Sequence, residues 1–265
     1  MANLTVTRSL IAEAAAQGAR FVLTPECTNL ISGDRAWQAS VLQPEQSDDT
    51  LAALRAQAAE LGIWLLIGSL ALKSDDPAEP RFANRSFLIG PDGRIVARYD
   101  KIHMFDVTIS DSESYRESAA YRPGSQAVLA EGPVPVGMTI CYDLRFPHLF
   151  RTLAQAGAQI VTVPAAFNDT TGAAHWHVLL RARAIETGCF VLAPAQCGLH
   201  PATHGKPSRP RRSYGHSLAV APWGEVIAEA GDSPGATIVT LDLEEIGKAR
   251  SRIPAFSGTQ TFGAP

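Results

Sequence analysis

The chain has 265 residues, of which 46% are hydrophobic and 18% charged, a composition typical of a globular protein with a sizeable core rather than a disordered segment. Its formal net charge of −3 offers no broad positive surface to phosphates or anionic lipids, so nucleic acids and membranes are excluded as expected partners. No stretch approaches the roughly 20 apolar residues of a membrane helix and no signal peptide is recognisable, so a cytoplasmic protein is expected.

Four segments repeat one pattern, in which a helix ends near a glycine and a buried strand follows. The helices are predicted at residues 4–15, 51–61, 149–156 and 174–187, and the strands at 21–23, 63–68, 160–163 and 190–193. Gly18, Gly62, Gly157 and Gly188 lie where a left-handed residue is expected after a helix. Because the strands are continuously apolar, they indicate sheets covered by helices in an α/β protein.

Two further segments are predicted to be β-hairpins. Residues 86–99 turn at Pro91-Asp92-Gly93, and residues 217–227 turn at Pro222-Trp223-Gly224. Parallel units combined with hairpins favour a helix-sheet-sheet-helix sandwich over a barrel. The stretch between Cys197 and Ser213 is rich in Pro, His and basic residues, including Arg209, Arg211 and Arg212, and is predicted to be a solvated loop or one that flanks a site. We predict one domain over residues 1–265.

Cys141 lies where an apolar strand runs into a helix-start pattern, within residues 136–147. A thiol at such a turn is expected to have its pKa lowered by the positive end of the helix, and the nearby backbone N–H groups can hold an oxyanion. Taken alone, a cysteine in this setting is more often a small buried hydrophobe. The other cysteines are Cys27, Cys189 and Cys197. No two of the four form a C-x-x-C pair, and all are expected to be reduced.

Glu26 and Lys101 also come at the ends of predicted strands. Each could be an ordinary surface residue, but if both face Cys141 the three supply a carboxylate base, a cation for an oxyanion and a thiolate nucleophile. No metal site is predicted, because His175 and His177 are two residues apart on a predicted helix and point to different faces. No glycine-rich phosphate loop is present.

With these residues in this order, the chain resembles the nitrilase superfamily of carbon–nitrogen hydrolases, whose members use a Glu-Lys-Cys triad. Supporting segments lie at residues 115–118, 171–176, 181–186 and 214–217. Residues 141–147, 179–186 and 195–198 resemble the Nit branch, which includes deaminated glutathione amidase and the omega-amidases. The resemblance implies a four-layer α-β-β-α sandwich of the nitrilase type, self-association as a homodimer or higher homo-oligomer, and no cofactor or metal.

The resemblance also implies roles in amide hydrolysis that releases an acid and ammonia or an amine. Glu26 deprotonates Cys141 for attack on the amide carbonyl, Lys101 and the Tyr142 backbone N–H hold the oxyanion, and Glu117 orients Lys101 and the amide. The rate should then fall in acid as Glu26 becomes protonated, and a profile flat over about pH 4 to 9 would contradict this base.

For substrate recognition, the resemblance implies that Arg145 holds a substrate carboxylate, with an internal salt bridge as the alternative. Phe167 and Thr171 are expected to line the pocket. Arg181 and Arg183 are expected to be structural and to pair with acids. Deaminated glutathione is the favoured substrate. The alternatives are 2-oxo-dicarboxylate monoamides, or a catalytically silent scaffold that only binds partners.

Two departures from the family pattern stand out. Members begin with a strand before the first helix, whereas this chain starts at Met1 apparently past that strand, so we expect it to begin at an internal methionine of a longer product. Activity could depend on the missing strand. In addition, His148 and His177 occupy positions where many relatives carry Glu.

Overall fold

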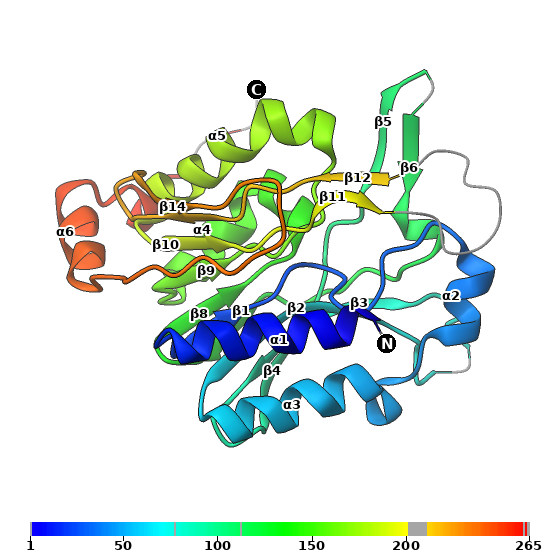
Figure 1. Cartoon of the computed structure of the whole chain (residues 1–265). Coiled ribbons are helices and arrows are strands. Elements are labelled where there is room, and N and C mark those ends of the chain that lie inside the picture. The colour runs from blue at the N-terminus through cyan, green and yellow to red at the C-terminus, as the bar shows by residue number, and fades with distance from the viewer. Residues whose placement is uncertain (1, 77, 112, 201–210, 262, 264–265) are drawn as a thin grey trace.

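The computed structural model describes residues 2–76, 78–111, 113–200, 211–261 and 263. Two sheets face each other, with helices covering the outer side of each (Figure 1). The first sheet has the order β1-β2-β3-β4, formed by β1 (Phe21–Leu23), β2 (Trp64–Leu72), β3 (Ala83–Ile89) and β4 (Ile95–Asp100). The second has the order β14-β13-β10-β9-β8-β7, formed by β7 (Val128–Glu131), β8 (Pro135–Met138), β9 (Ile160–Thr162), β10 (Phe190–Ala193), β13 (Leu218–Val220) and β14 (Val226–Glu229).

The helices complete the four layers. The first sheet is covered by α1 (Ala2–Ala16) and α3 (Asp49–Leu61), and the second by α4 (Pro147–Gln155) and α5 (Asp169–Thr187) (Figure 1). The predicted α-β-β-α sandwich is confirmed. The other elements are α2 (Arg35–Val41), α6 (Glu244–Arg252), the two-stranded pairs β5 (Asp106–Ser110) with β6 (Glu113–Arg116) and β11 (Cys197–His200) with β12 (Arg211–Tyr214), and 3₁₀ turns at Glu45–Ser47, Glu117–Ala119, Cys141–Arg145 and Ala255–Ser257.

The helix ends follow local chemistry. Gly62 and Gly188 take the left-handed conformation that ends α3 and α5, as predicted. The start predicted for α5 was wrong by five residues, because the Asn168 side chain accepts a hydrogen bond from the Thr171 N–H and so begins the helix at Asp169.

Both predicted hairpins are confirmed, as β3–β4 and β13–β14. The strands of the repeated pattern pair in parallel, β1 with β2 and β9 with β10. The prediction of a loop between Cys197 and Ser213 was wrong at its two ends, because Cys197 pairs with Tyr214 and His200 with Arg211 in an antiparallel ladder. Arg212 belongs to this ladder as well, whereas Arg209 lies outside the described residues.

The largest apolar cluster joins the two sheets. It includes Leu66 and Leu88 from the first sheet, Met138 from the second, Phe150 from α4 and Trp176 from α5, all completely buried. Packing of both sheets into one core fixes the ends of their strands relative to each other. The candidate site lies at these strand ends.

β1 is an edge strand of its sheet in the described part of the chain. The expectation of a further strand before the first helix concerns residues ahead of Met1 and stays a prediction. Among the described residues, no helix has both the length and the apolar character needed to cross a membrane.

Candidate active site

Three strand ends bring Glu26, Lys101 and Cys141 together. Glu26 follows β1, Lys101 follows β4 and Cys141 follows β8, so two come from the first sheet and one from the second. Their exposed fractions are only 3%, 2% and 7%. The Lys101 ammonium donates to Glu26 Oε1 at 2.9 Å, and the charges of both groups act on the pKa of the Cys141 thiol. A base, a cation and a nucleophile therefore share one buried site.

The Glu26 carboxylate is held from three sides. In addition to Lys101, Asn84 Nδ2 donates to Oε1 at 2.9 Å, and the Ala166 backbone N–H donates to Oε2 at 2.8 Å. These donors fix the orientation of the carboxylate and favour its charged form. Asn84 was missed in the sequence analysis, because a single polar residue on a buried strand carries no pattern that distinguishes it from a satisfied core amide.

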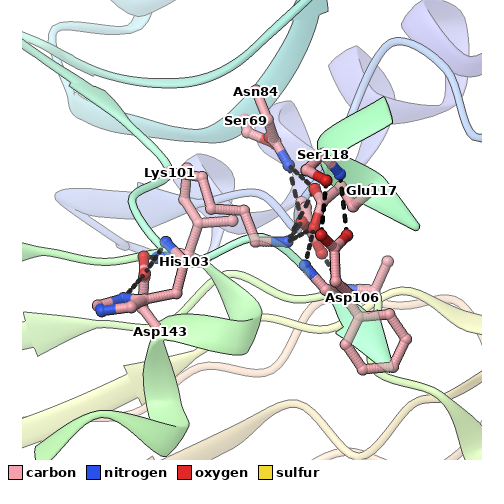
Figure 2. A network of polar contacts seen from close by, with 12 residues as sticks. Ser69, Asn84, Lys101, His103, Asp106, Glu117, Ser118 and Asp143 are labelled. Carbon is pink, nitrogen blue, oxygen red and sulfur yellow. Dashed lines mark hydrogen bonds and ion pairs between the residues drawn. The ribbon is translucent and has the colours of Figure 1, made fainter. Parts of the chain in front are cut away.

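Glu117 holds the other side of the lysine, as Figure 2 shows. Its two carboxylate oxygens accept from Lys101 Nζ at 3.0 and 2.8 Å, and Oε2 also accepts the Phe105 backbone N–H at 2.7 Å. Ser118, the next residue, hydrogen bonds to Asp106 through both its backbone N–H and its hydroxyl. Glu117 is thus fixed in place and in turn positions the ammonium.

The charges of these groups are set by burial and by one another. Burial disfavours the charged form of Glu26, but Lys101, Arg211 and the Ala166 N–H together outweigh burial and lower the pKa of the carboxyl. Burial also opposes the charge of Lys101, yet the carboxylates of Glu117 and Glu26 raise the pKa of the ammonium well above its ordinary value. At neutral pH the pair is therefore carboxylate and ammonium.

The pKa of Cys141 is raised well above its ordinary value, by burial and by the Glu26 carboxylate. The prediction of a lowered pKa was therefore wrong. Only a 3₁₀ turn, Cys141–Arg145, follows the thiol, so there is little helix dipole, and the attraction of Lys101 does not offset burial and the carboxylates. Cys141 stays a thiol in the resting site, and a base must take its proton.

These pKa shifts predict the pH dependence of the reaction. Because the pKa of Glu26 is depressed, the base stays ionised at neutral pH and is lost only as the pH falls through that lowered value. We expect kcat/KM to be flat over about pH 5 to 9 and to fall below this range. Because the pKa of Glu26 is lowered, the acid limb is expected at lower pH than for an ordinary glutamate, so a profile still flat near about pH 4 does not by itself contradict this base. Initial rates measured across this pH range test the prediction, and circular dichroism at each pH separates titration from unfolding. An acid limb centred above about pH 6 would contradict the prediction.

Cys141 has an unusual backbone. Its φ of +49° lies in the left-handed region, which is uncommon outside glycine and is often found where a reactive side chain must be presented. Its N–H donates to the Pro164 carbonyl at 2.9 Å, which ties the turn to the end of β9. Within the described residues the next N–H, that of Tyr142, has no hydrogen-bond acceptor, so it can donate to a substrate oxygen.

Asp143 fixes this turn from beneath. Its completely buried carboxylate accepts from the Tyr99 hydroxyl at 2.7 Å and from the Ile140 N–H at 2.9 Å. It also accepts from His103, through the backbone N–H at 3.0 Å and Nδ1 at 2.7 Å (Figure 2). Tyr99 and His103 flank Lys101 in sequence. This Asp143 network therefore connects the lysine segment with the cysteine turn, and the sequence analysis did not identify it.

Gly68 lets the two strand ends approach. A methyl group on Gly68 would overlap the carbonyl oxygens of Thr24 and Pro25 and the Cβ atom of Pro164. Thr24 and Pro25 lead into Glu26, and Pro164 holds the N–H of Cys141. A residue without a side chain is needed here for the base and the nucleophile to lie in one site.

Three of the predicted substrate-binding residues meet beside the triad. The Arg145 guanidinium lies over the rings of Tyr142 and Phe167, at 5.9 and 5.3 Å from their centroids, and its two terminal nitrogens are each 3.3 Å from His175 Nδ1. Within the described part of the chain Arg145 makes no ion pair with a carboxylate. Thr171 lies on the first turn of α5, where its N–H donates to Asn168 at 3.1 Å.

Arg211 is a further cation near the site that the sequence analysis did not single out from its basic neighbours. Its Nη2 donates to the Ala166 carbonyl at 3.1 Å, and its charge helps to lower the pKa of Glu26. Of the arginines expected to be structural, Arg183 pairs with Glu186 at 2.9 Å as predicted, whereas Arg181 donates to the Gly224 carbonyl.

Cys27, beside Glu26 in sequence, is also a protonated thiol. All four cysteines are free, as predicted. Burial and the Glu26 charge raise the pKa of Cys27 to about 12, so this thiol is protonated at neutral pH.

Residues 1–251 of this chain match the family described as carbon–nitrogen hydrolase. The chain is 41% identical over 240 residues to the deaminated glutathione amidase of Yersinia enterocolitica, covering 89% of this chain and 80% of that protein. It is 40% identical over 260 residues to the protein of the same name from Mus musculus, covering 96% of this chain and 77% of that one.

Solved structures agree in fold. The C. elegans NitFhit protein superposes with a TM-score of 0.86 at 33% identity, over 97% of this chain and 61% of that longer one. An amidase from Nesterenkonia sp. AN1, in which acrylamide has added to the active-site cysteine, superposes with a TM-score of 0.74 at 27% identity, over 95% of this chain and 91% of that one. The family match over residues 1–251 spans the positions of Glu26, Lys101 and Cys141.

Proposed function

Because this chain belongs to the carbon–nitrogen hydrolase family, we propose that its hydrolysis of amides proceeds through Cys141 as the nucleophile, with Glu26 as base and Lys101 as the oxyanion-binding cation. The observation that carries this assignment is the burial of all three groups in one site, where the Glu26 carboxylate accepts from the Lys101 ammonium and acts on the pKa of the Cys141 thiol. The active-site cysteine of the similar Nesterenkonia amidase supports it.

In the first half of the reaction, Glu26 takes the proton from Cys141 as the sulfur attacks the amide carbonyl carbon. The carbonyl oxygen becomes an oxyanion, which accepts hydrogen bonds from the Lys101 ammonium and the Tyr142 N–H. When the C–N bond breaks, Glu26 returns the proton to the nitrogen, and ammonia or an amine leaves a thioester on Cys141. Removing the proton during attack suits a thiol whose pKa is raised.

In the second half, Glu26 deprotonates a water that attacks the thioester carbon at the same oxyanion site. The C–S bond then breaks, the acid departs and the thiolate takes back a proton from Glu26. Glu117 acts in both halves by holding Lys101 through two hydrogen bonds and by helping to orient the substrate amide.

We propose an amide that carries a carboxylate as the substrate, with deaminated glutathione favoured. Arg145 supports this choice, because its guanidinium is half-buried and makes no ion pair within the described residues. Phe167 and Tyr142 give it aromatic surfaces, and Thr171 lies on the adjoining helical turn. The names of the relatives from Yersinia enterocolitica and Mus musculus favour deaminated glutathione over simple omega-amides.

The experiment is to compare deaminated glutathione with 2-oxoglutaramate. Hydrolysis of either amide releases 2-oxoglutarate, with cysteinylglycine or ammonia as the second product, so one assay follows both. We expect release from both and a higher kcat/KM for deaminated glutathione. A higher value for 2-oxoglutaramate would favour the omega-amidase alternative, and release from neither would reject this substrate class.

Substitution of Arg145 tests the carboxylate contact. We expect Arg145→Gln to raise KM by about 10- to 100-fold with a smaller change in kcat, since a charge-assisted hydrogen bond to the substrate is lost. Arg94→Gln, which removes a guanidinium that is 84% exposed, is the matched control and should leave KM unchanged. An unaltered KM in Arg145→Gln would remove Arg145 from recognition but leave the triad assignment intact.

We also propose that the enzyme is a single domain, that it acts in the cytoplasm and that it self-associates. A core shared by both sheets supports the first, and four free cysteines fit a reducing compartment. Val178 and Ile185 on α5, with exposed fractions of 68% and 50%, give an apolar surface that a second copy could cover.

A further inference from the structure

Outside the triad site, His177, His216 and Glu229 form a cluster at one edge of the second sheet. His177 Nε2 and His216 Nδ1 each lie 2.9 Å from Glu229 Oε1, and all three atoms are within 4.8 Å of one another. The three residues come from α5, the segment before β13, and the end of β14. The residues of the proposed reaction have no part in this cluster.

We propose that this cluster binds a divalent transition metal ion of the Zn²⁺ class. Two imidazole nitrogens and one carboxylate oxygen are ligands that Zn²⁺ prefers, at bond lengths of about 2.0 to 2.2 Å. Ligand atoms around a tetrahedral ion are then about 3.4 Å apart, so the two nitrogens, at most 4.8 Å apart, need to approach by no more than about 1.4 Å. Small side-chain rotations cover this distance.

The scaffold around the cluster is rigid. His216 has a left-handed φ of +56°, its N–H donates to the Gly231 carbonyl at 3.0 Å, and its carbonyl accepts from Trp176 Nε1 at 2.8 Å. The Tyr214 ring stacks on the His216 ring, with centroids 4.4 Å apart. Since Trp176 is completely buried and adjoins His177, the two histidines are anchored to the same core residue. Such pre-positioning lowers the cost of assembling a metal site.

The exposure of the cluster suits an exchangeable ion. The side chains of His177, His216 and Glu229 are 32%, 30% and 39% exposed, so solvent can reach the ion and supply the remaining ligand. His175, two residues from His177 on the same helix, instead contacts Arg145, as expected from their different faces. The metal would therefore link α5 to the β13–β14 hairpin.

Direct metal titration of tag-free, chelator-treated full chain tests the proposal. With Zn²⁺ in calorimetry, and with Co²⁺ followed by its visible absorption, we expect one ion per chain. The variants His177→Gln, His216→Asn and Glu229→Gln should each weaken binding by at least about tenfold. Losing a residue that only hydrogen bonds to a metal ligand already costs about tenfold or more in affinity, so losing a ligand itself should cost no less. Asn is chosen at His216 because it tolerates the left-handed backbone.

Two controls separate this site from others. His175→Gln and Cys141→Ala should keep the affinity for Zn²⁺, and thermal unfolding without metal should show that every variant is folded. Equal affinities in the three cluster variants and the unaltered chain would overturn the proposal. Loss of binding in Cys141→Ala alone would also overturn the proposal, because the ion would then lie at the thiol. A stoichiometry close to zero would overturn it as well.

Discussion

Replacement of Cys141 by alanine should lower 2-oxoglutarate release from either amide by at least about four orders of magnitude, because the reaction loses the atom that forms the thioester. The change removes one buried sulfur atom and leaves the contacts of Lys101 with Glu26 and Glu117 in place, so the protein should remain folded. Rates with each amide, together with intact-mass detection of an acyl adduct on the unaltered chain, provide the measurement.

Cys197→Ala is the matched control for this prediction, since Cys197 is a free thiol in β11 and takes no part in the proposed reaction. It should keep the rate and the adduct. Full 2-oxoglutarate release by folded Cys141→Ala would contradict the thiol mechanism. Cells that retain the protein's full function with Cys141→Ala would instead favour the silent-scaffold alternative.

The Glu26→Gln protein should be slower than the unaltered enzyme by a factor of about 10² to 10⁴, the range lost when a general base is removed. Glutamine has the same shape, but it cannot take a proton from Cys141. Its amide nitrogen must also face either the Lys101 ammonium or the Ala166 N–H, both of which are donors. The same variant should lose the acid limb of the pH profile that belongs to Glu26.

Glu131→Gln provides the control for loss of an acid, because Glu131 is exposed on β7. Its rate and pH profile should match those of the unaltered chain. A rate for Glu26→Gln within tenfold of the unaltered enzyme, in a protein with an unchanged melting temperature, would assign the base to another residue. The pH profile distinguishes a lost base from a distorted site, since distortion alone would leave an acid limb.

The positions of several strands along the chain were predictable because apolar runs and glycine stops are local signals. The units around Gly62 and Gly188 show this, since each joins a helix to the strand that the sequence indicates. The meeting of Glu26, Lys101 and Cys141 was also predictable in outline, because each residue lies shortly after the end of a strand. The start of α5 was missed because it depends on a single cap, Asn168.

The charge state of the site could not be predicted from sequence. The pKa of Cys141 depends on burial and on Glu26, which is distant in sequence. The local helix-start pattern contains neither, and so it predicted a lowered pKa where the pKa is raised. Asn84 and Asp143 were missed for a related reason, because their roles come from hydrogen bonds to partners on other segments. The approach of Arg211 depends on the pairing of β11 with β12, which the predicted loop did not contain.

The Asp143 network has a consequence for how the molecule loses its structure. Tyr99 and His103 belong to the segment that leaves the first sheet, whereas Ile140 and Asp143 belong to the segment that leaves the second. Separating the two segments would deprive this buried carboxylate of three of its four donors, which is a large free-energy cost. We therefore expect heat or denaturant to abolish activity together with the separation of the two sheets, and not through an earlier local loosening at the site.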